Sequence, residues 1–210
     1  GLVTVALPKE EIQTLLGHVG VGHVRYSTTG SKSIQNAQPL TVMTNFGTVA
    51  VAHNGDITNF AQLKEKYMKE GWTFLTDSDS ELVTKLLGKY MTMYNDPVKA
   101  IRAAMGELDG SFSITMLIND RLFAIRDMYG FRPLCLGKID GGYIAVSESA
   151  AIDALRGELI RDIEPGEICE ITKDTFKIYP PPAEHPKAFC MFEWVYFARP
   201  DSILDGQEVY

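Results

Sequence analysis

The chain has 210 residues, of which 45% are hydrophobic and 22% are charged, as is typical of a single folded domain with an apolar core. Its formal net charge of −7 argues against nucleic-acid binding, which depends on clustered lysine and arginine side chains. It has neither a signal-peptide pattern nor an apolar run of the roughly 18 residues that a membrane span requires. The three cysteines are too widely spaced for a disulfide framework, and we therefore expect a cytoplasmic location.

The first quarter of the chain combines short apolar runs with a long polar segment. Pro8 begins a predicted helix and Gly17 ends it, since proline favours the first turn of a helix and glycine the position after the last. Alternating apolar residues predict strands, and asparagine with glycine between two such runs predicts a hairpin. The expected elements are a helix over 8–16, a buried strand over 19–26, a polar loop over 27–39, and strands over 40–44 and 48–53 joined by a hairpin at 45–47.

The rest of the chain changes from helical to strand patterns near residue 110. Capping residues predict helices over 59–70, from 77 to about 94, and from 96 to before Asp109. Strands are expected over 111–118, 121–126, 132–138, 143–147, 167–171 and 175–179, with a short helix over 149–155. Turns are expected at Asn119-Asp120 and at Asp140-Gly141-Gly142. Because this order is not a regular βαβ alternation, we predict an α+β fold in which helices pack outside antiparallel sheets.

Three short segments stand out because they are polar and contain glycine or acidic residues where a predicted strand or loop ends. Functional sites are commonly built at such positions. The segments are GHVRYSTTG (22–30), AHNGDITN (52–59) and TDSDSE (76–81).

Arg25 closes an otherwise apolar run in the first of these segments. A planar guanidinium is a natural bidentate partner for a carboxylate, although a surface salt bridge explains the residue equally simply. Ser27 and Thr28 could add hydroxyl donors to the same anion, and by themselves they are ordinary loop residues. The segment is therefore a candidate carboxylate site.

The other two segments each allow a structural and a functional interpretation. Asn54-Gly55 is by itself a hairpin-turn signal, but an asparagine amide and a glycine N–H can also form an oxyanion hole. Asp79 is interpreted either as a helix N-cap or as a partner for an ammonium group. His23 and His53, in strand-like runs, are interpreted as core histidines. Arg25, Asp79 and Asn54-Gly55 together suit glutamine undergoing amide hydrolysis, with the nucleophile missing.

The three segments, in this order and spacing, resemble those of the class II (N-terminal nucleophile) glutamine amidotransferases. RYST followed by glycine differs from the RWATHG pattern of the sugar-phosphate aminotransferases, and the HNG segment is shared with asparagine synthetases. The tail FCMFEWVYFARPDS, Cys190 to Ser202, is similar to the FEY-VYF-RPDS signature of the amidophosphoribosyltransferase family. The resemblance covers residues 1–210, which we interpret as one glutamine amidotransferase domain.

The resemblance implies a four-layer αββα sandwich of antiparallel sheets, as in N-terminal-nucleophile hydrolases. It implies that Arg25 and Asp79 bind the α-carboxylate and α-amino group of glutamine, and that Asn54 and Gly55 form the oxyanion hole. Tyr26 and Thr28 would lie in a mobile loop, roughly residues 25–36 of this chain, that corresponds to the loop closing over glutamine in the family.

Members of this family make 5-phosphoribosylamine from glutamine and phosphoribosyl pyrophosphate, the first committed step of purine synthesis. Ammonia passes to a C-terminal phosphoribosyltransferase domain of the same protein, so glutamine and that domain are the expected partners. Magnesium is expected only for the transferase domain, and the full-length enzyme is expected to be a homo-oligomer. No cofactor is expected in the glutaminase domain itself, although Cys190 matches an iron–sulfur ligand of some members.

The printed chain departs from the family pattern in three places. It does not begin with the Cys-Gly of the family, so we expect an N-terminal truncation that removes a few dozen residues including the nucleophile. It ends where a transferase domain would begin, and Met128-Tyr129 replaces a more usual Pro-Asn. Only a terminal cysteine can use its own α-amine as the general base, so the printed chain is expected to be inactive alone.

Three hypotheses remain open from the sequence. The chain is either a fragment of a working glutaminase, or a relative without a nucleophile that binds glutamine or serves as a scaffold. The third is a different amidotransferase, such as an asparagine synthetase relative, against which the RPDS tail argues.

Overall fold

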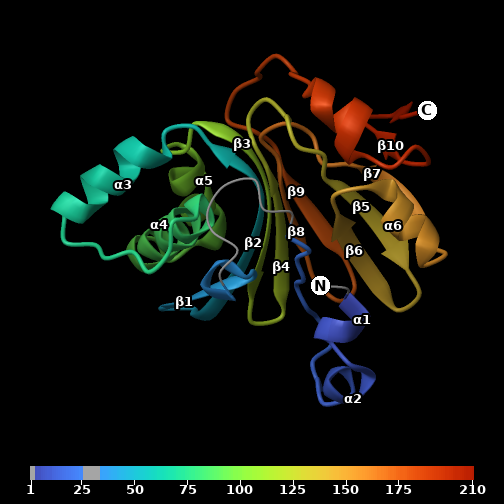
Figure 1. Ribbon diagram of the computed structural model, residues 1–210, viewed down its shortest axis with the longest axis horizontal. Coiled ribbons are helices and arrows are strands. Elements are labelled where there is room, and N and C mark those ends of the chain that lie inside the picture. Colours follow the sequence, from blue (N-terminus) through green and yellow to red (C-terminus); the bar gives the residue numbers. More distant parts are fainter. Residues whose placement is uncertain (1–2, 26–33) are drawn as a thin grey trace.

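The computed structural model describes residues 3–25 and 34–210, which form four layers (Figure 1). A six-stranded sheet carries three helices on one face, and its other face is turned toward a three-stranded sheet whose outer side is covered by a sixth helix. Every strand pair is antiparallel. The α+β prediction and the αββα layering are therefore confirmed.

The large sheet has the strand order β1-β2-β3-β4-β8-β9. Two of its connections are the tight turns predicted from asparagine and glycine: Thr44 pairs with Gly47, and Ile118 pairs with Arg121. At both turns the chain adopts a positive φ, at Gly47 and at Asn119, which these two residue types tolerate best. The strands are β1 (Leu40–Thr44), β2 (Gly47–Ile57), β3 (Gly110–Ile118), β4 (Arg121–Arg126), β8 (Ile168–Ile171) and β9 (Phe176–Tyr179).

The small sheet has the order β6-β5-β7 and is covered by one short helix. Its first hairpin turns at the predicted Asp140-Gly141-Gly142, where Gly141 has a positive φ. The strand β7 was not predicted, because ELIRD lacks a clear alternation of apolar and polar residues. The elements are β5 (Cys135–Ile139), β6 (Gly142–Val146), α6 (Ser149–Ala154) and β7 (Glu158–Asp162).

Three helices, α3 (Phe60–Lys69), α4 (Asp79–Met93) and α5 (Pro97–Met105), cover the outer face of the large sheet, as predicted. The side chain of Asp96 caps α5 by accepting hydrogen bonds from the backbone of Val98 and Lys99, and proline follows it at the first helical position. Asn59 precedes α3 as predicted, but its side chain bonds Glu107 O and Asp109 N instead of capping the helix.

Two apolar cores fill the layers, and alternation along the strands separates them. In β4, Phe123 and Ile125 face the helices. Leu122 and Ala124 of the same strand face the small sheet and pack with residues of β5 and β8. One strand therefore serves two cores, because successive side chains point to opposite faces of a sheet.

The beginning of the chain differs from its prediction. The helix expected over 8–16 is only α2 (Lys9–Ile12), preceded by α1 (Val3–Ala6), and the strand expected over 19–26 is wrong for residues 19–25. Those residues are extended, but they belong to no sheet, and Val24 is 77% exposed. An alternating pattern forms a strand only where a neighbouring strand supplies hydrogen bonds.

The end of the chain lies against the small sheet and α6 (Figure 1). It contains a one-turn π-helix, η2 (Glu193–Phe197), and a small hairpin of β10 (Ile203–Leu204) and β11 (Gln207–Glu208), none of which was predicted. A short 3₁₀ turn, η1 (Ile34–Asn36), precedes β1. The tail therefore adds structure to the side of the molecule opposite the three outer helices.

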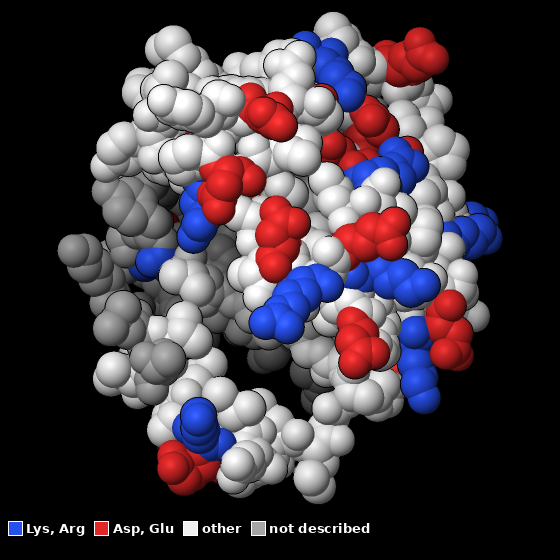
Figure 2. Space-filling model, turned by 90° about the vertical axis from the view of Figure 1, so that its right-hand side faces the viewer, with Lys and Arg blue, Asp and Glu red and all other residues white. Residues whose placement is uncertain are grey.

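In the described part of the chain, no helix has the length and apolarity that a membrane span would need. Figure 2 shows the face on the small-sheet side, where lysine and arginine side chains are interspersed with aspartate and glutamate. No continuous basic surface is present on that face.

Candidate functional site

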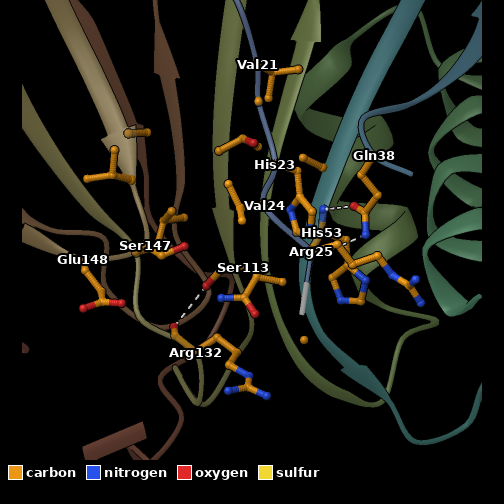
Figure 3. Close-up of a pocket in the computed structure, with 18 of the residues that line it drawn as sticks. Val21, His23, Val24, Arg25, Gln38, His53, Ser113, Arg132, Ser147 and Glu148 are labelled. Carbon is orange, nitrogen blue, oxygen red and sulfur yellow. Dashed lines mark hydrogen bonds between the residues drawn. The ribbon is translucent and has the colours of Figure 1, made fainter. Parts of the chain in front are cut away.

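A cavity of about 650 Å³ opens between the two sheets, next to the N-terminus of α4. Arg25, Asn54, Gly55 and Asp79 all line it, although they come from three segments of the chain. In Figure 3, Arg25, Gln38 and His53 lie on one side of the cavity and Ser147 and Glu148 on the other, with Ser113 and Arg132 between them at one end. The fold thus brings the three predicted site segments to one place.

Asn54 and Gly55 lie inside β2 and not in a turn, so the simple turn interpretation is wrong. Asn54 pairs with Ser113 of β3, and Gly55 pairs with Phe112. The alternation along β2 places Asn54 on the cavity side, whereas Val49 and Val51 face the helices. The amide side chain of Asn54 is therefore presented to the cavity by a strand that is paired with β3 from Val49 to Ile57.

Gly55 is required by packing. A β-carbon at this position would lie 1.9 Å from the carbonyl oxygen of Ser111 and 2.8 Å from His53 Nε2. Both distances are far below van der Waals contact, and the first involves backbone that cannot move aside. Glycine therefore allows β2 and β3 to approach closely beside the cavity.

Asp79 is the first residue of α4 and is 6% exposed. Its Oδ2 accepts a hydrogen bond from Ile57 N at 3.1 Å, across to the end of β2. The N-cap is Ser78, whose hydroxyl accepts from Ser80 N, so the N-cap interpretation of Asp79 is wrong. The carboxylate instead lies at the positive end of the helix dipole, beside Asn54 and Gly55 in the lining of the cavity.

Gln38 connects the two elements that carry Asn54 and Asp79. Its side-chain Oε1 accepts from His53 N at 2.6 Å, and its Nε2 donates to His53 O at 3.3 Å and to Ser80 Oγ at 3.0 Å. Leu40 pairs with Val51 at the end of the β1–β2 ladder, so the Gln38 amide bonds β2 two residue pairs beyond that end. Gln38 thereby ties the start of α4 to the strand next to Asn54.

His53 is buried at 3% exposure on the helix side of β2, as expected of a core histidine, but it also lines the cavity and its Nε2 has no hydrogen-bond partner among the described residues. Its Nδ1 lies 3.2 Å from Ser80 Oγ and 3.8 Å from Asp79 Oδ1. Burial lowers the pKa of His53 below its ordinary value, and the charge of Asp79 only partly opposes this. The ring is therefore a neutral packing partner of Asp79 at neutral pH.

His23 is half-buried and lines the cavity instead of lying in a core, so its interpretation as a core histidine is wrong. Burial and the nearby His53 and Arg25 lower its pKa. Arg25 is also half-buried and lines the same cavity. Tyr26 and Thr28, predicted for the closing loop, lie outside the described residues.

The far end of the cavity contains a buried ion pair that the sequence did not indicate as part of a site. Arg132 Nη1 lies 2.7 Å from Glu193 Oε2, and both residues line the cavity. Glu193 is 6% exposed, and it is the only charged residue in the run FCMFEWVYF. A single carboxylate within an apolar run is a signal for a buried, paired charge.

None of the three cysteines lines the cavity. Cys135 and Cys169 are buried in strands, and burial raises the pKa of each thiol to about 12, so neither is a thiolate at neutral pH. Cys190 is half-buried, and within the described residues no three metal-ligating side chains gather in one place. An iron–sulfur cluster needs about four ligands, of which Cys190 would be only one.

The comparisons with known proteins agree with this arrangement. A family model described as a glutamine amidotransferase domain matches residues 23–154. The chain is 45% identical over its whole length to the amidophosphoribosyltransferase of Archaeoglobus fulgidus, of which it covers 46%. Against the protein of the same name from Homo sapiens the identity is 36%, with 45% of that protein covered. The chain thus spans about half the length of the curated relatives that it matches.

Two solved structures share the fold. Glutamine phosphoribosylpyrophosphate amidotransferase from B. subtilis, complexed with ADP and GMP, superposes with a TM-score of 0.81 at 31% identity, covering 89% of this chain and 40% of that one. A structure described as the allosteric regulatory enzyme of purine biosynthesis gives 0.82 at 32% identity, with the same coverage of 89% and 40%. Because the family model covers more than half of the chain, and because the fold is that of the N-terminal-nucleophile hydrolases in both structures, the chain belongs to the glutamine amidotransferase family.

Proposed function

We propose that the cavity binds L-glutamine and that the chain is the glutaminase domain of an amidophosphoribosyltransferase. The observation that supports this most directly is the gathering of Arg25, Asn54, Gly55 and Asp79 in the lining of one cavity. Between them these residues offer a cation, an anion and neutral hydrogen-bond donors. Glutamine presents the complementary groups: a carboxylate, an ammonium and an amide carbonyl.

Asp79 is suited to the α-ammonium group of glutamine. Its carboxylate is buried, and one oxygen is fixed by Ile57 N, so little side-chain freedom is lost on binding. Arg25 supplies a guanidinium for the α-carboxylate. The charges of the amino acid therefore determine its orientation, with the side-chain amide directed along the cavity.

Asn54 and Gly55 are the proposed oxyanion donors. The negative oxygen that develops during amide hydrolysis would accept hydrogen bonds from the Asn54 side chain and the Gly55 N–H. Donors held rigidly in this way contribute about 3–4 kcal/mol each to transition-state stabilisation. The strand pairing of β2 with β3 supplies the rigidity.

The nucleophile is proposed to be a terminal cysteine on sequence that the printed chain does not contain. Cys135 and Cys169 are protonated and buried, and Cys190 does not line the cavity. An N-terminal cysteine would use its own amine as the base. We therefore expect the printed chain to bind glutamine without hydrolysing it.

The names of the relatives support a proposal for the whole protein. Ammonia released from glutamine would pass to a phosphoribosyltransferase domain that requires Mg²⁺, and the product would be 5-phosphoribosylamine for purine synthesis. A cytoplasmic homo-oligomer is expected for such an enzyme. These statements concern the complete gene product, whereas this chain covers 46% of the Archaeoglobus fulgidus relative.

The test uses the complete gene product and measures the ammonia released by hydrolysis of L-glutamine and of two analogues. Glutaramate lacks the α-ammonium group, and 4-aminobutyramide lacks the α-carboxylate. Asp79→Asn should raise KM for glutamine by roughly 10- to 150-fold, which corresponds to about 1.5–3 kcal/mol for a charged hydrogen bond. The same variant should no longer discriminate against glutaramate, while Arg25→Met should lose discrimination against 4-aminobutyramide.

The matched control is Asp120→Asn, which removes an exposed carboxylate in the β3–β4 turn and should behave as wild type. A wild-type protein that binds glutamine by calorimetry but forms no glutamate would support the alternative of a glutamine-binding relative without a nucleophile. A protein that neither binds nor hydrolyses glutamine would refute the proposal.

A further inference from the structure

The segment from Phe189 to Phe197 has two very different faces. Outward, it exposes large apolar side chains, including Met191 at 68%, Val195 at 70% and Tyr196 at 68%. Inward, it places Glu193 against Arg132 at 2.7 Å, with the two side chains only 7% and 18% exposed. The segment is thus anchored to the cavity through one buried charge pair.

Both the guanidinium and the backbone carbonyl oxygen of Arg132 have partners. Its guanidinium pairs with Glu193 and lies 5.2 Å from the centre of the Phe197 ring. Its carbonyl oxygen accepts from Ser113 Oγ at 3.0 Å and from Arg126 Nε at 2.8 Å. One residue therefore contacts the C-terminal segment with its side chain and the large sheet with its backbone.

Ser113 completes the connection to the proposed oxyanion hole. It is the direct partner of Asn54 in the β2–β3 ladder, so the two side chains lie on the same face of the sheet. Ser113, Asn54 and Arg132 all line the cavity. A continuous path of contacts thus runs from Glu193 through Arg132 and Ser113 to Asn54 (Figure 3 shows Ser113 and Arg132).

We propose that Arg132, held by Glu193, is a positioning residue that sets the placement of the Asn54 oxyanion donor. The inference rests on the proposed function, because it assigns Arg132 a role in the reaction for which Asn54 is the donor. Arg132 acts through Ser113 and the backbone of β3, and the position of the C-terminal segment therefore affects the geometry of the reacting amide.

The physical reason concerns precision more than stability. A buried ion pair adds little net stability compared with apolar residues of the same size. It does fix one geometry, since the planar guanidinium bonds its partners in defined directions. Catalysis is sensitive to such geometry, because a displacement of about 1 Å can lower the rate about 100-fold.

The experiment measures kcat and KM for glutamine hydrolysis in the complete gene product. Arg132→Met and Glu193→Ala should each lower kcat about 10- to 100-fold and change KM by less than about 2-fold, because an oxyanion donor acts mainly in the transition state. Glu193→Gln keeps an acceptor in place and should retain kcat to within about 3-fold. The double variant Arg132→Met/Glu193→Ala should be no slower than the slower single variant.

The matched control is Arg121→Met. Arg121 in β4 pairs with Glu170 in β8 at a distance of 2.7 Å, as Arg132 does with Glu193, and the Arg121 side chain is 37% exposed. Arg121 does not line the cavity. This substitution should leave kcat unchanged. Should Arg132→Met fail to fold, as judged by its thermal unfolding, Arg132→Lys takes its place, with an expected fall in kcat of about 3- to 10-fold.

The outcomes separate this inference from the proposed function. A wild-type protein without glutaminase activity overturns both. An active wild type, combined with folded Arg132 and Glu193 variants that keep kcat, overturns the positioning role alone. The positioning role is also overturned if Arg121→Met loses as much kcat as Arg132→Met. It is overturned as well if the Arg132 and Glu193 variants raise KM at constant kcat, or if the losses of kcat in the double variant are additive.

Discussion

The two sides of the candidate glutamine site are built in different ways. Asn54, Gly55 and Asp79 are carried by a paired strand and by the first turn of α4, and Gln38, His53 and Ser80 connect these two elements through hydrogen bonds. Arg25 instead belongs to residues 19–25, which join no sheet. The proposed oxyanion and ammonium sites are therefore preformed, whereas the proposed carboxylate site lies on a part of the chain that no strand pairing holds.

The contrast is instructive because the two segments have similar sequences. VGVGHVRY and TVAVAHNG both alternate apolar and small residues and both contain a histidine. Only the second forms a strand, since β1 and β3 flank it on either side. Strand formation is thus determined by available neighbours and not by the pattern alone.

The largest expected effect is the loss of stability on replacing Gly55 in β2, compared with replacing Gly22 in residues 19–25. Gly55→Ala should lower the free energy of unfolding by about 3 kcal/mol and abolish glutamine hydrolysis, because its β-carbon would lie 1.9 Å from Ser111 O. Gly22→Ala, with nothing within 4 Å of the added carbon, should change stability by at most about 1 kcal/mol. The free energy of unfolding of both variants is measured in urea. Equal losses of stability in the two variants would show that residues 19–25 are as tightly packed as β2.

A smaller loss is expected where Gln38 completes the strand ladder. Gln38→Leu removes the hydrogen bonds to His53 N, His53 O and Ser80 Oγ and should cost about 2 kcal/mol. Gln62→Leu, an exposed position on α3, is the control and should stay within about 0.5 kcal/mol of wild type. If Gln38→Leu were equally harmless, the connection between β2 and α4 would not depend on this amide.

The smallest effect concerns pH. Burial lowers the pKa of His53, so below about pH 6.5 the unfolded chain binds a proton that the folded chain does not. Stability contributed by neutral His53 is therefore present above that pH and is lost as the pH falls. The free energy of unfolding, measured from pH 7 to pH 5, should fall less steeply in His53→Gln than in wild type.

A second histidine adds to the pH test. His23, whose pKa is also lowered by burial, should account for part of the remaining slope. A His53→Gln slope identical to wild type would contradict the lowered pKa.

Much of the fold could be predicted from the sequence where local interactions decide it. The turns at 45–47, 119–120 and 140–142 and the starts of α4 and α5 were predicted correctly, because glycine, asparagine and capping residues act within a few positions. The strand β7 and the structure of residues 193–208 were missed. The strand β7 pairs with β5, from which β6 and α6 separate it in the sequence, and the strands β10 and β11 pair through only two residues each, which is too short for a clear pattern.

The candidate site shows the same division. The three polar segments were recognised from their residues, and the cavity contains Arg25, Asn54, Gly55 and Asp79 from them. The roles of Gln38, Ser113 and Arg132 had no local signature, and the single carboxylate of Glu193 in its apolar run indicated a buried charge but not its partner. Each depends on a partner more than a dozen residues away, and such contacts exist only once the sheets have formed.

The sequence by itself therefore determined which residues this protein can use for chemistry, and where its turns and helix caps lie, since those properties belong to individual side chains and their neighbours. The tertiary structure decided that Asn54-Gly55 is the middle of a strand, that residues 19–25 are not a strand, and that Arg132 and Glu193 meet beside the cavity. The physical reason is that hydrogen bonding in sheets and the pairing of buried charges join groups that the chain itself holds far apart.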